Sequence, residues 1–455
     1  SATASATSDA YASADATTYA SASSYATSYA YGGAISNQGT IGNITGDFIN
    51  NYSEAKAILG SASSGSAYSY SGSANANRGS SSASASAGSD FGVSSDNYYN
   101  SNSASSSVSG SSSSNSTQYD SDKPEAFIHP DETYQNPDGT WGGIGAYSLS
   151  ANASTNAQSY ISNGASESEY ASSSTSAKAY AYGGAIYNAS SKTIGNITGS
   201  FNGNYAQAEA ATTSEAHGGA IYSQGTIGTI TANFTGNYIN AKNATYGGAI
   251  FNSGSITGLS GNFTNNYIKN TASGSAFGGA IYNTSTITNG LSNSTLSNNY
   301  VTTTGSAQGG AIYNSGSNFG DISATFIKNY AQTNSNPYGG AIYNSGTIKS
   351  ISGSFSNNYT LANSSNACGG AIYNTKTITN GISNSSFSNN YTQANTGTIQ
   401  GGAIYNNSSS SLNISADFSN NYAKSLSNGT IQGGAIYNSG SGNVNITSNF
   451  SQNYV

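Results

Sequence analysis

The sequence predicts an all-β fold, a parallel β-helix (β-solenoid) whose coils each take about 30 residues and three short strands. Two motifs and their spacing carry this prediction. The tetrapeptide Gly-Gly-Ala-Ile starts at residues 32, 183, 218, 247, 278, 309, 339, 369, 401 and 433, so copies from the second onward lie 29 to 35 residues apart. Nine of the ten copies precede a Phe-x-x-Asn-Tyr segment, such as Phe48 to Tyr52. This period is typical of a unit that buries its apolar face only against copies of itself.

The residues between the motifs favour strands and turns over helices. Ile44 to Phe48 alternates apolar or small residues with polar ones, and β-branched residues are frequent. Asn-Ser-Gly, Gly-Asn and Asn-Asn separate these runs, and such residues tolerate the left-handed backbone angles of tight turns. A propeller blade would need about 40 residues and four strands, so the shorter period favours a β-helix coil.

Parallel stacking in register places like residues on like residues, so we expect each inward position to form a column. The predicted isoleucine column contains Ile35, Ile186, Ile221, Ile250, Ile281, Ile312, Ile342, Ile372, Ile404 and Ile436. The predicted phenylalanine column contains Phe48, Phe201, Phe234, Phe263, Phe326, Phe355, Phe387, Phe418 and Phe450, with Leu296 replacing the aromatic residue in one copy.

A tyrosine follows most copies of Gly-Gly-Ala-Ile, as Tyr343 does, and alternation along the strand puts it on the outer face. A column of such rings could bind sugars or a partner chain. We favour the alternative interpretation, in which the column packs under a loop or stiffens the stack. The asparagines that come next, such as Asn344, are interpreted as ladders at the turns.

The repeats divide the chain into four segments. Residues 32–52 form the first regular coil, 53–182 are expected to form irregular coils with long low-complexity loops, and 183–455 form a regular β-helix of nine repeats. In residues 1–31 alanine and tyrosine alternate with the period of a strand. This segment is either a first coil or an N-terminal arm that adds strands to a neighbouring molecule. The tyrosines available for such a contact are Tyr11, Tyr19, Tyr25 and Tyr29.

Residues 119–141 stand apart within the irregular segment. They contain three of the four prolines and Trp141, the single tryptophan, which is another candidate partner contact. Prolines stiffen a loop and charge concentrates here, so we expect a projecting functional loop. Its carboxylates are weak calcium candidates: Asp120, Asp122, Asp131 and Glu132. Because their spacing is not that of an EF-hand, a solvated loop without a ligand is the favoured interpretation, and no metal or other cofactor is expected.

Composition and charge disfavour several classes of protein. Charged residues make up 6% of the chain and the net charge is −7, with no basic stripe, so a nucleic-acid partner is not expected. No apolar run is long enough to predict a membrane span. The acidic residues of the repeats, such as Asp47, Asp321 and Asp417, lie at differing positions in different copies. The repeats therefore lack the carboxylate pairs of glycosidases, and we expect no enzyme.

The alternation of Gly-Gly-Ala-Ile with Phe-x-x-Asn resembles the polymorphic outer membrane protein family. The resemblance covers residues 32–52 and 183–455, about two thirds of the chain. It implies a right-handed β-helix of the autotransporter passenger type, an extracellular location at a bacterial surface, and adhesion or self-association. It carries no catalytic residue to any position here. The chain starts at Ser1 without methionine, which we interpret as the mark of a processed product.

Two functions follow from these observations. The favoured one is a non-enzymatic structural or adhesive protein that assembles into filaments through uncapped coils or the N-terminal strand. Its partners would be copies of itself or ligands on host or other cell surfaces. The alternative is a carbohydrate-binding or polysaccharide-processing β-helix with its site in residues 53–182.

Overall fold

The structure confirms the all-β fold and the parallel stacking of the repeats. The computed structural model describes residues 2–7, 17–57, 65–68, 80–85, 100–101, 134–135, 141–142, 153–160, 166–210, 212–270 and 273–455. All regular elements in these ranges are strands. The chain divides into two compact units, the first of Ser1–Thr27, Ala57–Lys178 and Ala210–Thr212, the second of Ser28–Lys56, Ala179–Glu209 and Thr213–Val455.

The first unit contains antiparallel pairings. β8 (Ser80–Ala85) lies between β1 (Ala2–Thr7) and β7 (Gly65–Tyr68). β10 (Tyr134–Gln135) pairs with β11 (Trp141–Gly142). β12 (Ala153–Tyr160) pairs with β9 (Asn100–Ser101) and with residues 166–173 of β13 (Ser166–Tyr182). None of these pairings has the parallel register of the repeats.

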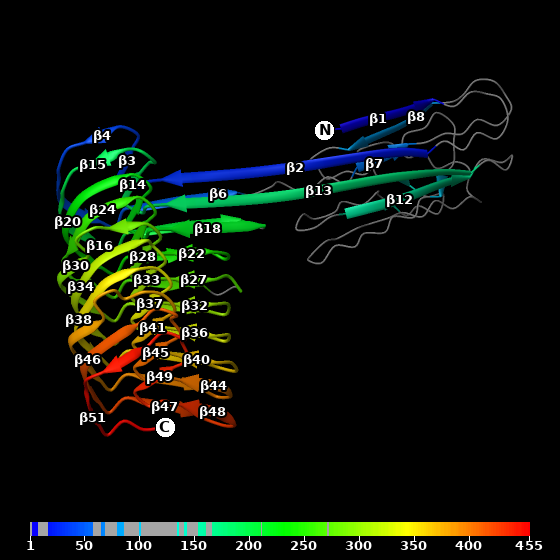
Figure 1. Ribbon diagram of the computed structural model, residues 1–455. Helices are drawn as coiled ribbons and strands as arrows, with labels where there is room; N and C mark the ends of the chain where they lie inside the picture. Colours follow the sequence, from blue (N-terminus) through cyan, green and yellow to red (C-terminus); the bar gives the residue numbers. More distant parts are fainter. Residues whose placement is uncertain are drawn as a thin grey trace. The chain divides into compact units, whose positions relative to one another are not determined.

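The second unit is the β-helix, in which parallel strands of successive coils form four sheets (Figure 1). The glycine sheet holds the strands that start at the isoleucine of Gly-Gly-Ala-Ile: β3 (Ile35–Asn37), β14 (Ile186–Asn188), β19 (Ile221–Ser223), β23 (Ile250–Asn252), β28 (Ile281–Asn283), β33 (Ile312–Asn314), β37 (Ile342–Asn344), β41 (Ile372–Asn374), β45 (Ile404–Asn406) and β49 (Ile436–Asn438).

The phenylalanine sheet carries the next part of each coil. It contains β4 (Thr40–Ile41), β5 (Ile44–Ile49), β15 (Thr193–Ile194), β16 (Ile197–Asn202), β20 (Thr226–Thr235), β24 (Ser255–Ser260), β25 (Phe263–Thr264), β29 (Thr286–Ile287), β30 (Leu291–Ser297), β34 (Asn318–Ile327), β38 (Ile348–Ser356), β42 (Ile382–Ser388), β46 (Leu412–Ser419), β50 (Val444–Ile446) and β51 (Asn449–Ser451).

The tyrosine sheet starts at the tyrosine of Phe-x-x-Asn-Tyr. It contains β6 (Tyr52–Ala57), β17 (Tyr205–Ala210), β21 (Tyr238–Asn240), β26 (Tyr267–Lys269), β31 (Tyr300–Thr303), β35 (Tyr330–Thr333), β39 (Tyr359–Ala362), β43 (Tyr391–Ala394) and β47 (Tyr422–Ser425).

The pre-glycine sheet closes each coil. It contains the C-terminal ends of β2 (Thr17–Tyr31) and of β13, followed by β18 (Thr213–His217), β22 (Thr245–Tyr246), β27 (Ala276–Phe277), β32 (Ala307–Gln308), β36 (Pro337–Tyr338), β40 (Ala367–Cys368), β44 (Gly397–Gln400) and β48 (Gly429–Gln432).

A regular coil thus contributes to four sheets, one more than the sequence predicted. The additional strand lies just before Gly-Gly, where the three-strand coil predicted from the sequence has no separate strand. The glycine pair bends the backbone sharply, with Gly339 at a φ of +66°, so the residues on its two sides belong to different sheets.

Both glycines of the pair are required by the geometry of this bend. A Cβ on Gly339 would lie 2.2 Å from the carbonyl oxygen of Ile342. A Cβ on Gly340 would lie 2.1 Å from the carbonyl oxygen of Gly370 in the next coil and 2.4 Å from that of Tyr359. These distances are far below van der Waals contact, so a larger residue would separate the coils.

Isoleucine and phenylalanine side chains fill the interior as columns. Ile312 pairs in register with Ile342, and Ile342 with Ile372. Neighbouring phenylalanine rings stack with centroids 4.6–5.0 Å apart. The eight isoleucines from Ile186 to Ile404 are fully buried. In the end coils Ile35, Phe48 and Ile436 are partly buried and Phe450 is 50% exposed, since they have a neighbouring coil on one side.

Two asparagine ladders hold the corners of the coils together. The first follows Gly-Gly-Ala-Ile: the Asn314 side chain donates to Asn344 Oδ1 at 2.9 Å and accepts from the Gly316 amide at 3.2 Å, so it closes a turn and bonds to the next coil. The second uses the asparagine of Phe-x-x-Asn-Tyr, where Asn329 donates to Asn358 Oδ1 at 2.9 Å and to the Leu296 carbonyl at 2.8 Å. Both ladders are buried because these bonds replace water.

The residue before the second ladder adopts a left-handed conformation in every copy. Asparagine or glycine usually stands there, as Asn357 does at a φ of +56°, whereas Lys328 has a φ of +54° without the local hydrogen bonding that helps asparagine. This turn directs the ladder asparagine inward.

Candidate functional site

The outer tyrosines of the glycine sheet form a column of stacked rings. Centroids of neighbouring rings lie 4.6–5.4 Å apart, and Tyr313 and Tyr343 are parallel to within 4°. Because each ring face is covered by the next ring, a sugar would meet only ring edges and hydroxyl groups. This geometry favours the interpretation in which the column stiffens the stack.

The tyrosine sheet carries a second column that continues without a break from Tyr52 to Tyr454. Its rings lie 4.7–5.1 Å apart and within 14° of parallel. Burial raises the pKa of Tyr391 to about 12. The phenol of Tyr391 is therefore neutral at physiological pH and presents a hydroxyl group without charge.

An aromatic corner, made of Tyr182, His217, Tyr222, Tyr246 and Phe251, fills the outer angle between the pre-glycine and glycine sheets. The imidazole of His217 stacks on Phe251 with centroids 5.0 Å apart and meets Tyr246 edge to face at 4.8 Å. Neither of its nitrogens has a hydrogen-bond partner among the described residues. Burial lowers the pKa of His217 to about 3, so this residue is neutral and packs as an aromatic side chain.

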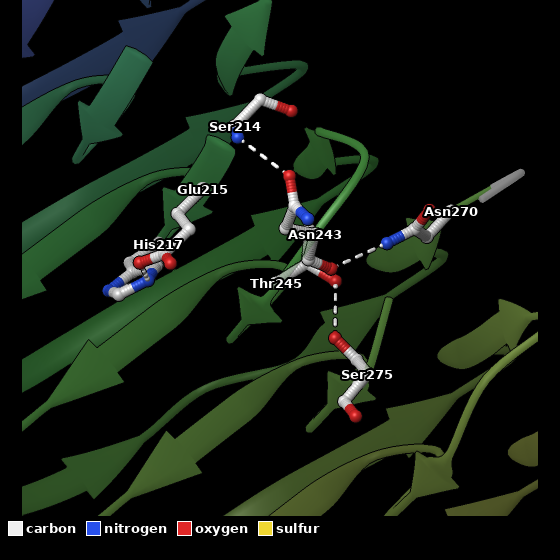
Figure 2. A network of polar contacts seen from close by, with 7 residues as sticks. All are labelled: Ser214, Glu215, His217, Asn243, Thr245, Asn270 and Ser275. Atoms are coloured by element: carbon white, nitrogen blue, oxygen red, sulfur yellow. Dashed lines mark hydrogen bonds and ion pairs between the residues drawn. The ribbon is translucent and has the colours of Figure 1, made fainter. Parts of the chain in front are cut away.

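Figure 2 shows the polar groups beside this corner. Glu215 Oε2 lies 3.9 Å from His217 Nε2, but the neutral imidazole makes this a contact rather than an ion pair. Farther along, the Ser214 amide donates to Asn243 Oδ1 at 2.7 Å, and Asn270 Nδ2 donates to the Asn243 carbonyl at 2.8 Å. These bonds connect the turns of successive coils, so we assign the network a structural role.

A polar groove crosses four coils of the phenylalanine sheet and has a volume of about 750 Å³. Its lining residues belong to β38, β42, β46 and the segment around β51: Gly353, Ser354, Asn384, Ser385, Ser386, Ser415, Ala416, Asp417, Thr447, Ser448 and Asn449. Hydroxyl and amide groups dominate this lining, and Asp417 supplies its one carboxylate.

The groove is built around a β-bulge in β42. The register shifts on both sides of this strand, which leaves Asn384 without a partner in the ladder and at a φ of +48°. Ser385 Oγ closes the bulge by donating to the Ser383 carbonyl at 2.9 Å. A matching bulge occurs in β30, where Asn293 has a φ of +49° and Ser294 donates to the Ser292 carbonyl at 2.8 Å.

Sequence reasoning missed the groove, although a signal for it exists. Ile382 and Phe387 are five positions apart, whereas Ile351 and Phe355 in the preceding coil are four apart. The extra residue is the bulged Asn384.

Most of the predicted ligand and contact residues lie outside the part of the chain whose side chains the structure describes. The calcium candidates Asp120, Asp122, Asp131 and Glu132 lie outside the described residues, as does Tyr11. For Tyr19, Tyr25 and Trp141 only the backbone is described. Tyr29 is 55% exposed and stacks on Tyr180 at 5.2 Å.

The described residues contain neither a metal-binding cluster nor a membrane-spanning helix. No group of three or more His, Cys, Asp and Glu side chains in that part of the chain is placed to hold a metal ion. None of its segments forms a helix with the length and apolar character of a membrane span.

Residues 415–439 match the Chlamydia polymorphic membrane protein repeat. The matched segment runs from β46 through Phe418 and Tyr422 to the last Gly-Gly-Ala-Ile, so it contains both motifs. Neither the curated proteins nor the solved structures contain a match to this chain. The chain resembles the polymorphic outer membrane protein family, in agreement with its motifs.

Proposed function

We propose that this chain is a non-enzymatic protein of a bacterial cell surface, and that its β-solenoid is a rigid support for adhesive side chains. The observation that carries the proposal is the match of residues 415–439, which contain both motifs, to the Chlamydia polymorphic membrane protein repeat. This repeat and the β-solenoid fold together fit a bacterial surface protein of the adhesin type.

The distribution of apolar and polar side chains over the coils supports a binding role. The interior is filled with Ile and Phe side chains, which leaves the outer face to contact other molecules. His217 is buried and neutral, and Asp321 is paired with Lys349 at 2.7 Å. These groups do not form the acid and base pair that hydrolysis of a glycan would need.

We also propose that copies of the chain associate through exposed strand edges. Among the described residues β3, β5 and β6 each pair with one neighbouring strand only. Ile49 and Tyr52 of this first coil are 58% and 53% exposed. An open edge with apolar side chains is a site for strand addition by another chain. The long strand β2 pairs with β13 of its own chain, so its use as an arm would require an additional partner on its other edge, which pairs with none of the described strands.

Bead adhesion tests the surface role. Beads coated with the folded chain should bind cultured epithelial cells better than beads coated with heat-unfolded chain or with albumin. Equal binding by the three preparations would overturn the adhesive function. Electron microscopy of the purified chain tests self-association, and a strictly monomeric population at high concentration would refute it.

A further inference from the structure

We propose that the polar groove binds a neutral, linear glycan, with Asn384, Ser386, Asp417 and Asn449 as its main contacts. This inference rests on the adhesive function proposed above and names the class of ligand that one face of the solenoid takes.

The bulge in β42 is the first observation that points to a ligand. Asn384 is exposed, and its side-chain amide makes no hydrogen bond among the described residues. Asparagine tolerates the left-handed conformation that the bulge requires, and bulges often occur where a strand directs a side chain toward a binding site. The bulge therefore presents a free amide, with a donor and an acceptor, in the lining of the groove.

The second observation is a row of polar side chains in register across the groove. Ser354 pairs with Ser386, Ser386 with Asp417, and Asp417 with Asn449. Neighbouring strands are about 4.8 Å apart, so the row extends for about 14 Å. A ligand that repeats its own polar groups along a line can contact one rung after another, whereas a compact molecule would reach only one or two.

The chemistry of the lining selects the class of polymer. Within the row, Ser386 Oγ donates to Ser354 Oγ at 3.3 Å and Asn449 Nδ2 donates to Asp417 Oδ1 at 2.8 Å. The Ser354 hydroxyl can still donate to a ligand, and the second oxygen of Asp417 can still accept from one. The lining residues include neither a cation nor an aromatic ring. An anionic polymer would meet Asp417 and no positive charge, and an apolar peptide would find little apolar area. A neutral chain of sugar hydroxyls fits both the donors and the acceptors.

The bulge at Asn293 provides a matched control within the same molecule. It has the same backbone geometry, but the amide oxygen of the neighbouring Asn262 accepts from the Thr295 backbone at 3.1 Å. The residue in register with Thr295 in the following coil is Thr325, and no carboxylate occupies that position. A change at Asn293 therefore repeats the structural effect of the same change at Asn384 without altering the groove.

The test is titration calorimetry of the full chain with neutral linear oligosaccharides of glucose, mannose and galactose and with oligogalacturonate as the anionic probe. At least one neutral oligosaccharide should bind, and oligogalacturonate should bind more weakly. Asn384→Gly should weaken binding about tenfold, the loss expected for about one hydrogen bond, and Asp417→Asn should weaken it several-fold. Asn293→Gly should leave affinity unchanged. Glycine suits the left-handed conformation, so both glycine variants should fold.

Absence of binding by all neutral probes, a preference for oligogalacturonate, or equal losses in Asn384→Gly and Asn293→Gly would each overturn the proposal. Adhesion assays separate it from the surface function. If beads bind cells and Asn384→Gly does not reduce that binding, the groove is not the adhesive site. If glycan binding depends on Asn384 but beads do not adhere to cells, the groove proposal stands and the adhesive function fails.

Discussion

Replacement of Asn329 by alanine tests the importance of the buried asparagine ladder. Asn329 Nδ2 donates to the Leu296 carbonyl and to Asn358 Oδ1, at 2.8 and 2.9 Å. Its Oδ1 accepts from the backbone and side-chain amides of Asn299, both at 3.0 Å. The side chain is fully buried, so water cannot replace these four bonds.

The variant would leave two buried N–H donors of Asn299 and the Leu296 carbonyl without the bonds that Asn329 makes. Each buried polar group left without a partner costs about 1–3 kcal/mol. Allowing for local rearrangement, we expect Asn329→Ala to lower the free energy of unfolding by about 3–6 kcal/mol. This exceeds the effect of an average substitution, which is about 1 kcal/mol.

Urea denaturation followed by circular dichroism measures this change, and amide hydrogen exchange locates it. Exchange should accelerate most in β31, β35 and β39, whose coils the ladder connects. Asn318→Ala is the matched control, because Asn318 is exposed on β34 and its loss should change stability by less than about 0.5 kcal/mol. If the two variants lose equal stability, or if Asn329→Ala costs less than about 1 kcal/mol, the ladder does not stabilise the fold as argued.

Four further predictions follow. Lys328→Asn should raise the free energy of unfolding by about 0.5–1 kcal/mol in urea titrations, since asparagine tolerates the left-handed conformation better than lysine does. A lower free energy of unfolding in this variant would contradict the prediction. Thr360→Val should stabilise the protein by about 1 kcal/mol in the same assay, because the buried Thr360 hydroxyl has no hydrogen-bond partner among the described residues. If the variant is less stable, the hydroxyl does make a hydrogen bond in the folded protein. Gly340→Ala should destabilise by about 3–5 kcal/mol, whereas Gly42→Ala, with open space at its Cβ, should be nearly neutral; similar values for both would refute the close-approach argument. Burial lowers the pKa of His217 to about 3 in the folded state, so on acidification the unfolded state binds the proton first. The free energy of unfolding should therefore fall as the pH drops below about 6.5, by up to about 1.4 kcal/mol per pH unit. Urea titrations at several pH values should show a smaller pH dependence for His217→Phe, and the same dependence in both proteins would show that His217 is not the cause.

The sequence predicted the stacking because its strongest signals are local and repeated. Ile342 and Phe355 recur at fixed places in the period, and both are fully buried in register with their equivalents. The fourth strand was missed because the bend at Gly339 depends on a backbone angle that hydrophobic alternation does not reveal.

The surface features were harder to predict than the core. His217 stands at a position that varies among copies, and its burial results from Tyr246 and Phe251, which come from another coil. The groove depends on one added residue, Asn384, whose effect becomes visible only when three successive coils are aligned. The sequence of a single repeat is therefore enough to predict the core, but not enough to predict the features of the outer face.

The amides of both asparagine ladders point in one direction along the axis. Asn37 donates to Asn188, and Asn329 donates to Asn358, so in each case the donor belongs to the earlier coil. Their dipoles therefore add, much as peptide dipoles add along an α-helix. One end of such a stack is rich in hydrogen-bond acceptors and the other in donors, so an added coil would be accepted in one orientation only, and growth of the stack would have a built-in polarity.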